Sequence, residues 1–221
     1  MKKILAALTA CTVFAVLLAA VGCSGGETFE AKRYSSGEDS VKSVSVDVTD
    51  REVEIITSTD GQVHIDYSES EQEFYSIRLS EDGDLTMTLE TDKDWTDFIG
   101  TKPAAQYRKI TLAVPSGLSD LTIKTTNEAI GVSTLTVQNA VLLDCNGGSV
   151  EFAQLGVGRS LDVTAKNGNI TGSVLGGWDD FSIACEIKKG ESNLPERKEG
   201  GEKSLTVNCN NGDIDIRFIT E

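Results

Sequence analysis

The residues that could do chemistry in this chain are acids. The candidate catalytic acids form two groups, which are Asp144, Glu151 and Asp162, and Asp213 and Asp215. Glycosidases and related enzymes on repeated β-strands use a pair of carboxylates for acid and base chemistry. Acids two residues apart in a strand share one face, however, and on an outer face they are commonly only solvated. Glycan clefts usually expose several aromatic side chains, whereas the tryptophans here are Trp95 and Trp178. We predict no catalytic residues, and a carbohydrate-active enzyme is the less favoured alternative.

Metal-ligating residue types are scarce in the sequence. The one histidine, His64, alternates with apolar residues in Val63–Tyr67, so we expect it to face solvent on a strand. A single imidazole cannot build a histidine-rich zinc site, and no nucleophile motif surrounds it. The segment Asp82–Asp84 is too short for an EF-hand loop, and the glycine-rich nonapeptide of calcium-binding β-rolls is absent. We therefore predict no metal site and no cofactor, while weak surface binding of divalent cations stays open.

The net charge excludes one class of partner. The chain has 20 basic and 35 acidic residues, and its first 22 residues hold two lysines and no acid. Without those residues the charge is 18 − 35 = −17. Such a surface repels phosphates, so we predict no nucleic acid partner. Solubility, cation binding and attraction to a basic partner all remain compatible with this charge.

The N-terminus has the pattern of an export signal. Lys2 and Lys3 precede an apolar or small-residue run from Ile4 to Val21, and a break follows at Gly22. The segment Ala20-Val21-Gly22-Cys23 resembles the lipobox of bacterial lipoproteins. The resemblance implies that residues 1–22 are a cleaved signal peptide and that Cys23 is acylated. The protein would then be anchored in the cell membrane through lipid, facing the extracytoplasmic side. A retained transmembrane anchor is the alternative.

The remainder divides into a tether and a β domain. Residues 23–42 are rich in serine and glutamate, so we predict a flexible tether after the lipidated cysteine. Residues 43–221 form the predicted domain, which begins with short runs of period-two alternation separated by Asp-Gly turns. Residues 92–106 interrupt this pattern and are expected to be a loop or a short helix. The domain is predicted to be all-β, with antiparallel-like strands first.

The second half carries a repeat of 20 residues. Its first strand position is filled by Leu121, Val141, Leu161 and Phe181, and a last copy begins at Leu205 after 24 residues. The consensus is L-x-V-x-small-x-N-G-x-I. Two strands per repeat cannot enclose a core alone, whereas stacked repeats share one. The pattern predicts a parallel β-solenoid-like domain with about 20 residues per rung, or a sandwich of solenoid-like character.

The repeat aligns equivalent residues of successive copies in two columns, one of turn residues and one of small buried residues. The predicted turn positions, where the chain would pass through a left-handed conformation, are Asn127, Gly147, Gly148, Asn167, Gly168, Asn211 and Gly212. The predicted column of small buried residues is Thr125, Cys145, Ala165, Cys185 and Cys209. Neighbouring rungs lie about 4.8 Å apart, which a disulfide tolerates, so a Cys185–Cys209 bridge remains open. Metal binding by this column is not expected.

Two features near the C-terminus are candidates for recognition. The polar insertion Lys188–Lys203 breaks the repeat and could protrude as a binding loop, or it could be a solvated connection. The last rung at Ile214–Phe218 could leave an open edge that pairs with a partner by strand addition.

The region Leu121–Phe218 resembles a known family. Lys203–Val207 running into Asn211–Ile216 is similar to the β-strand repeats of bacterial envelope proteins known as putative adhesins, a domain of unknown function. The N-terminal strands from Val44 fit the same family. The resemblance implies a β-solenoid, a link to envelope-stress systems in some members, and no catalytic residues. We therefore expect a cell-surface lipoprotein that displays a non-enzymatic, adhesin-like binding module, with an envelope protein or a glycan as partner. An envelope-stress-linked structural protein is the alternative.

Overall fold

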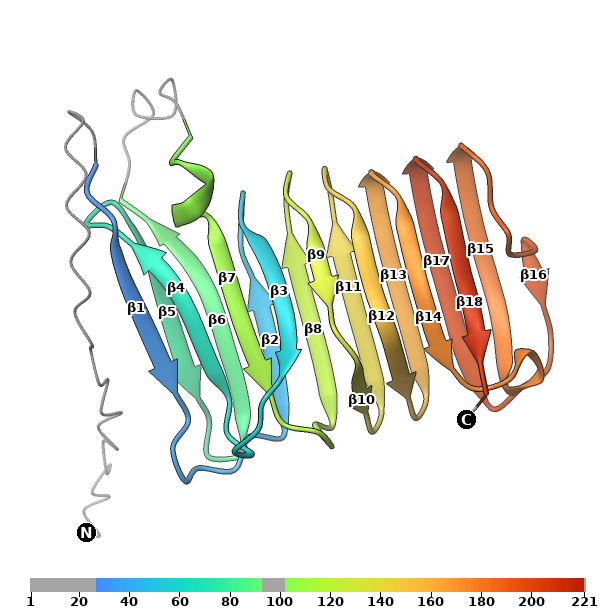
Figure 1. The fold of residues 1–221 in the computed structure, drawn as a ribbon, viewed down its shortest axis with the longest axis horizontal. Coiled ribbons are helices and arrows are strands. Elements are labelled where there is room, and N and C mark those ends of the chain that lie inside the picture. Colours follow the sequence, from blue (N-terminus) through green and yellow to red (C-terminus); the bar gives the residue numbers. More distant parts are fainter. Residues whose placement is uncertain (1–26, 93–101, 221) are drawn as a thin grey trace, which may run out of the picture.

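The computed structural model describes residues 27–92 and 102–220, and within them the chain forms two β-sheets that face each other (Figure 1). The predicted signal peptide, Cys23 and residues 93–101 of the predicted interruption, with Trp95, lie outside the described residues. None of the helices in the described ranges has the length and apolar composition that a membrane crossing requires. Within the described ranges, the helices are the short 3₁₀ turns η2 (Ala105–Tyr107) and η3 (Trp178–Asp180).

Each sheet has nine strands among the described residues. Sheet A runs in the order β1 (Glu30–Ser35), β4 (His64–Glu69), β7 (Lys109–Val114), β3 (Glu52–Thr57), β9 (Ile130–Val132), β12 (Val150–Val157), β14 (Ile170–Leu175) and β18 (Ile214–Ile219), with β10 (Leu135–Val137) also paired to β12. Sheet B runs in the order β16 (Arg197–Lys198), β15 (Phe181–Lys189), β17 (Lys203–Asn211), β13 (Ser160–Asn167), β11 (Ala140–Cys145), β8 (Asp120–Thr125), β2 (Ser43–Asp47), β6 (Asp84–Thr91) and β5 (Glu73–Leu79).

The predicted all-β, solenoid-like fold is confirmed. Strands β8, β11, β13 and β17 stack in parallel, with Val141 opposite Leu121 and Leu161 opposite Leu205. Alternate residues of these strands point inward and form one core between the sheets. The N-terminal part is mixed rather than simply antiparallel: β1–β4, β4–β7 and β5–β6 are antiparallel, whereas β2–β6 and β3–β7 are parallel.

The order of the rungs in space differs from their order in the sequence. Strand β17 lies between β13 and β15, so the last repeat copy stacks on the third copy and the fourth lies outside it (Figure 1). Cys209 therefore stands opposite Ala165. Cys185 stands opposite Val207, two residues out of the predicted column, and Ile187 is the residue opposite Cys209. The chain enters β15 through η3 and not through a two-residue turn, as it does at β11 and β13. The residues of β15 are therefore shifted in register relative to the earlier repeat copies.

All five residues of the predicted small column are buried all the same. Thr125 is 4% exposed and donates a hydrogen bond from Oγ1 to the carbonyl oxygen of Arg51 at 2.6 Å. Cys145, Cys185 and Cys209 are free thiols, so the described residues contain no Cys185–Cys209 bridge. Burial raises the pKa of the Cys145 and Cys209 thiols.

The predicted left-handed turns are wrong at most positions. Asn127 has a φ of 57° and Gly212 a φ of 151°, but the other five predicted positions lie outside the left-handed region. Glycine is needed there because adjacent turns stack in contact. A Cβ at Gly148 would lie 2.4 Å from the carbonyl oxygen of Glu128, and one at Gly168 would lie 2.2 Å from that of Gly148.

The predicted tether is too long, because its residues 30–35 form strand β1. This strand pairs antiparallel with β4 along its whole length. Its polar side chains form cross-strand ion pairs, such as Arg33 Nε with Asp66 Oδ1 at 2.6 Å. The buried anchors are Tyr34, which is 5% exposed, and Phe29, whose ring stacks on Tyr107. A polar sequence can form an edge strand because the backbone supplies the pairing.

The insertion Lys188–Lys203 does not protrude; part of it closes the C-terminal end of the solenoid. The amide of Ile214 on edge strand β18 donates to the carbonyl of Glu191 at 2.8 Å, and the Asn193 amide donates to the Ile214 carbonyl at 3.1 Å. The side chain of Asn193 then serves both backbone groups of Ile216, at 3.0 and 2.8 Å. The predicted open edge of β18 is therefore covered over its first half.

The same insertion also covers the edge of sheet B and the core between the sheets. Strand β16 pairs antiparallel with β15, and the Cys185 amide donates to the carbonyl of Glu196 at 2.9 Å. Between these contacts Leu194 enters the core and is 7% exposed. We call residues 191–198 the cap segment, because a solenoid needs a terminal element that ends its core and its strand edges.

Candidate functional site

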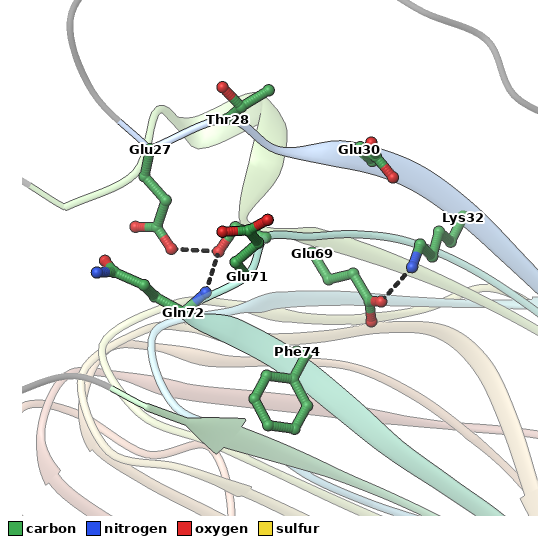
Figure 2. A pocket seen from close by; sticks show the side chains of 9 residues that line it. Glu27, Thr28, Glu30, Lys32, Glu69, Glu71, Gln72 and Phe74 are labelled. Carbon is green, nitrogen blue, oxygen red and sulfur yellow. Dashed lines mark hydrogen bonds and ion pairs between the residues drawn. The ribbon is translucent and has the colours of Figure 1, made fainter.

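The opposite end of the sandwich has no cap of this kind among the described residues. Strands β1 and β5 are the last strands of the two sheets there, and each pairs with one neighbour. A pocket of about 780 Å³ opens at this end, with side chains from β1, from the β4–β5 turn and from β5 (Figure 2). Its lining includes Glu27, Glu30, Lys32, Glu69, Glu71 and Phe74. We call it the N-terminal pocket.

The N-terminal pocket is acidic. Four glutamates and one lysine line it, which gives a net charge of −3. Lys32 Nζ lies 2.5 Å from Glu69 Oε1, and the Ser70 hydroxyl donates to Glu27 (Figure 2). Glu30 and Glu71 are exposed. A concave site with excess charge of one sign concentrates ligands of the other sign, so this pocket favours cations.

Aromatic side chains lie beside and behind the acidic residues of the pocket. Phe74 is 39% exposed and lies beside the acidic side chains (Figure 2). Behind it, the rings of Tyr67 and Tyr75 meet edge to face with centroids 5.0 Å apart. Burial and the negative charge of Glu69 raise the pKa of Tyr67 to about 12. The pocket thus combines carboxylates with an apolar surface, as recognition of a lysine or arginine side chain requires.

A buried ion pair fixes strand β5 beneath the pocket. Arg51 is 2% exposed; its guanidinium donates to Glu73, and its Nε donates to the Tyr75 hydroxyl at 2.7 Å. The Tyr75 amide donates to Glu69 Oε2 at 3.3 Å, which orients that carboxylate. These hydrogen bonds hold Tyr75 and Glu69 in fixed positions beside the pocket.

The outer edge of β5 has free pairing capacity. The Ser70 amide donates to the carbonyl of Glu73 at 2.7 Å, which covers the start of the edge. Further along, Ile77 and Leu79 form no backbone hydrogen bond with any described residue outside the β5–β6 hairpin. Such an edge can accept an extended chain as an additional strand.

The predicted acids are divided between the two sheets. Asp144 and Asp162 lie on the neighbouring strands β11 and β13 of sheet B, with Asp162 opposite Leu142, whereas Glu151 lies on sheet A, in the opposite layer. Asp213 accepts a hydrogen bond from the Glu191 amide at 2.9 Å, and Asp215 accepts one from the Asn193 side chain at 3.1 Å. These last two acids therefore hold the cap segment.

His64 is partly exposed at the start of β4. Its Nδ1 lies 2.6 Å from the Ser35 hydroxyl, and its Nε2 lies 2.8 Å from Asp60 Oδ2. Across the described ranges, no three histidine, cysteine, aspartate or glutamate side chains are grouped closely enough to hold a metal ion.

Sequence reasoning missed the N-terminal pocket. Four of its nine lining residues fall in the segment that we predict to be a tether, and the other five fall in the turn between β4 and β5 and in the adjoining ends of these strands. One signal was present: Phe29 and Tyr34 are large aromatic residues in a segment that is otherwise polar. Aromatic residues in such a segment indicate docking against a core.

Comparison with known proteins agrees with this architecture. The chain is similar to the crystal structure of a putative cell adhesion protein from Clostridium sporogenes, with a TM-score of 0.60 and 10% identity over 88% of this chain and 100% of that chain. Putative adhesins from Bacteroides fragilis (TM-score 0.37, 10% identity, 90% and 100% covered) and Parabacteroides merdae (TM-score 0.37, 14% identity, 84% and 80% covered) are more distant. No curated protein matches the chain.

At 10% identity, the likeness to the Clostridium sporogenes structure establishes the fold alone. The family is established by sequence, because the family model described as Toastrack DUF4097 matches residues 41–176, which is more than half of the 221 residues. The match spans strands β2 to β14, which include the first three repeat copies. The chain belongs to the Toastrack DUF4097 family.

Proposed function

We propose that this protein is a lipoprotein of the bacterial envelope whose domain is a non-enzymatic binding module. The partner we favour is an extended basic segment of another envelope protein, bound at the N-terminal pocket and the adjoining edge of β5. The observation that carries the proposal is the difference between the two ends of the sandwich. Residues 191–198 close one end, while the other ends in two edge strands around an acidic pocket.

The charge and backbone of this end suit such a partner. Glu30 and Glu71 are exposed and can pair with lysine or arginine side chains, while Phe74 offers an apolar face to their aliphatic stems. The edge of β5 at Ile77 and Leu79 can pair with the partner's backbone. Together these contacts combine main-chain affinity with side-chain selection, as in other cases of strand addition.

The proposed anchor places this pocket near the membrane. Cys23 precedes Glu27 by four residues, and four extended residues span at most about 14 Å. A lipid attached to Cys23 would hold the pocket close to the extracytoplasmic surface, where the exposed segments of membrane proteins begin. The similarity to a putative cell adhesion protein supports binding rather than catalysis as the role of the fold.

A charge-reversal capture experiment tests the proposal. The full-length chain, solubilised in detergent with its anchor, is used to capture partners from native envelope extracts. We expect the double variant Glu30→Lys/Glu71→Lys to lose the captured protein, because it replaces two exposed carboxylates of the pocket with ammonium groups.

The matched control is Glu199→Lys/Glu202→Lys, which changes the net charge equally between β16 and β17, at the opposite end of sheet B, where both residues are exposed. The control should keep the partner. Equal capture by both double variants, or equal loss in both, would remove the N-terminal pocket as the binding site.

A further inference from the structure

The two sheets form successive levels, each of which places one strand of sheet A against one strand of sheet B. The two strands of a level follow each other in the sequence, as β4 and β5, β6 and β7, β2 and β3, β8 and β9, β11 and β12, β13 and β14, and β17 and β18 do. The levels have the same order in both sheets. Among the described strands of the two sheet paths, β1 at one end and β15 with β16 at the other remain outside these levels (Figure 1).

At the C-terminal end, the cap segment fills the strand place in sheet A that lies opposite β15. Ser192 forms a parallel bridge with Ile214 on β18, next to which a further strand of sheet A would lie. Leu194 then enters the core and is 7% exposed. The chain therefore completes its last level with a short extended segment and one buried apolar side chain.

At the N-terminal end, the corresponding strand place lies in sheet B, beside β5 and opposite β1. Glu69 and Ser70 contact the start of this edge, and beyond them no described residue pairs with it. The N-terminal pocket opens at this place, with Lys32 of β1 on one side and Phe74 of β5 on the other (Figure 2). We call it the vacant strand place, in the sense that no described residue occupies it.

Three rows of core side chains cross sheet B and end beside the vacant strand place. The rows end on β5 with Tyr75, Ile77 and Leu79, which stand opposite Leu89, Met87 and Leu85 of β6. Met87 and Leu85 are each 1% exposed, whereas the three residues of β5 are only partly buried. The difference arises because β6 has a neighbouring strand on both sides and β5 has one on a single side. A further strand would bury the ends of these rows if its alternate residues were apolar.

We propose that the partner donates one β-strand to the vacant strand place. This strand has apolar residues at three alternate positions, which continue the rows of Tyr75, Ile77 and Leu79. Lysine or arginine residues stand at its end beside the N-terminal pocket, where they meet the exposed Glu30 and Glu71. The inference rests on the proposed function and adds the mode of binding, because a basic segment without this alternation satisfies the pocket and leaves the rows uncovered.

The test uses synthetic peptides and the full-length chain in detergent. Two acetylated and amidated peptides carry the alternation in the two chain directions, Lys-Lys-Ser-Val-Thr-Val-Thr-Val-Thr and Thr-Val-Thr-Val-Thr-Val-Ser-Lys-Lys. Their matched controls keep the composition and the lysines but group the valines, as Lys-Lys-Ser-Val-Val-Val-Thr-Thr-Thr and Thr-Thr-Thr-Val-Val-Val-Ser-Lys-Lys. We expect one alternating peptide to bind about tenfold or more tightly than its control in fluorescence anisotropy, because only alternation directs all the valines to the core.

Amide hydrogen exchange, followed by NMR, locates the bound peptide on β5. Binding should slow exchange at Ile77 and Leu79, whose amides lie on the open edge of the strand. Exchange at Ser76 and Arg78 is the internal control, because their amides face β6 and should be unaffected.

The outcomes separate this inference from the proposed function. Equal binding of the alternating and control peptides would retain a basic partner for the pocket and overturn strand donation. Strand donation is also overturned if neither alternating peptide binds, or if binding leaves exchange at Ile77 and Leu79 unchanged. Protection of these two amides before any peptide is added would overturn it as well, because another part of the chain would then fill the place. Failure of the proposed function itself shows in the capture experiment, as equal capture by both double variants.

Discussion

At the scale of single residues, the stability of the stack depends on contacts between adjacent turns that leave no room for a side chain. A Cβ at Gly148 would lie 2.4 Å from both the carbonyl carbon and oxygen of Glu128. We expect Gly148→Ala to lower the free energy of unfolding by about 1–3 kcal/mol, the usual cost of overpacking. Denaturant titration measures this. Gly131→Ala, in open space, should change it by about 0.5 kcal/mol or less, and equal effects for both variants would contradict the account.

The raised pKa of Tyr67 makes the free energy of unfolding depend on pH in the alkaline range. Its pKa is raised to about 12 in the folded chain by burial and by Glu69, against about 10 for an exposed tyrosine. Between these values the folded chain keeps a proton that the unfolded chain has lost, so stability is full below pH of about 10 and falls as the pH rises towards 12. Denaturant titrations from pH 8 to 11 should show this loss, and Tyr67→Phe should reduce it. Identical profiles for wild type and variant would refute the linkage.

At the scale of elements, the cap segment occupies the strand edges that an open solenoid end would leave free to pair with another chain. Leu194 is its buried contact with the core, at 7% exposure. We expect Leu194→Ala to cost about 2–5 kcal/mol and to speed amide hydrogen exchange at Ile214 and Ile216, whose backbone groups the segment covers. The exposed neighbour Glu196 supplies the control Glu196→Ala, which should leave both unchanged. Unaltered exchange in Leu194→Ala would mean that the segment does not cap β18.

At the scale of the whole molecule, the repeat predicted the architecture because core spacing and strand pairing obey the same period. Leu121, Val141 and Leu161 stack in the predicted register. The position of β15 could not be read from the sequence, because a spacing of 24 residues does not say on which side of β17 the fourth copy lies. Strand β1 was missed for another reason: pairing through the backbone leaves little mark on side-chain pattern.

The candidate site was harder to predict than the fold. The sequence directs attention to Lys188–Lys203, whose polar composition suits a binding loop, but its polar groups satisfy two strand edges instead. The N-terminal pocket is built from residues of β1 and β5, which lie far apart in the sequence and meet only through the order of strands in both sheets. No short stretch of the sequence therefore predicts that these residues form a pocket.

Site-specific photocrosslinking in cells shows whether the partner binds at the N-terminal end of the sandwich. A photoreactive phenylalanine analogue is placed at Phe74, at the pocket, or at the exposed Glu151 on the outer face of sheet A. We expect a light-dependent adduct of one defined mass from position 74 and none from position 151. Adducts from both positions alike, or from position 151 alone, would contradict it.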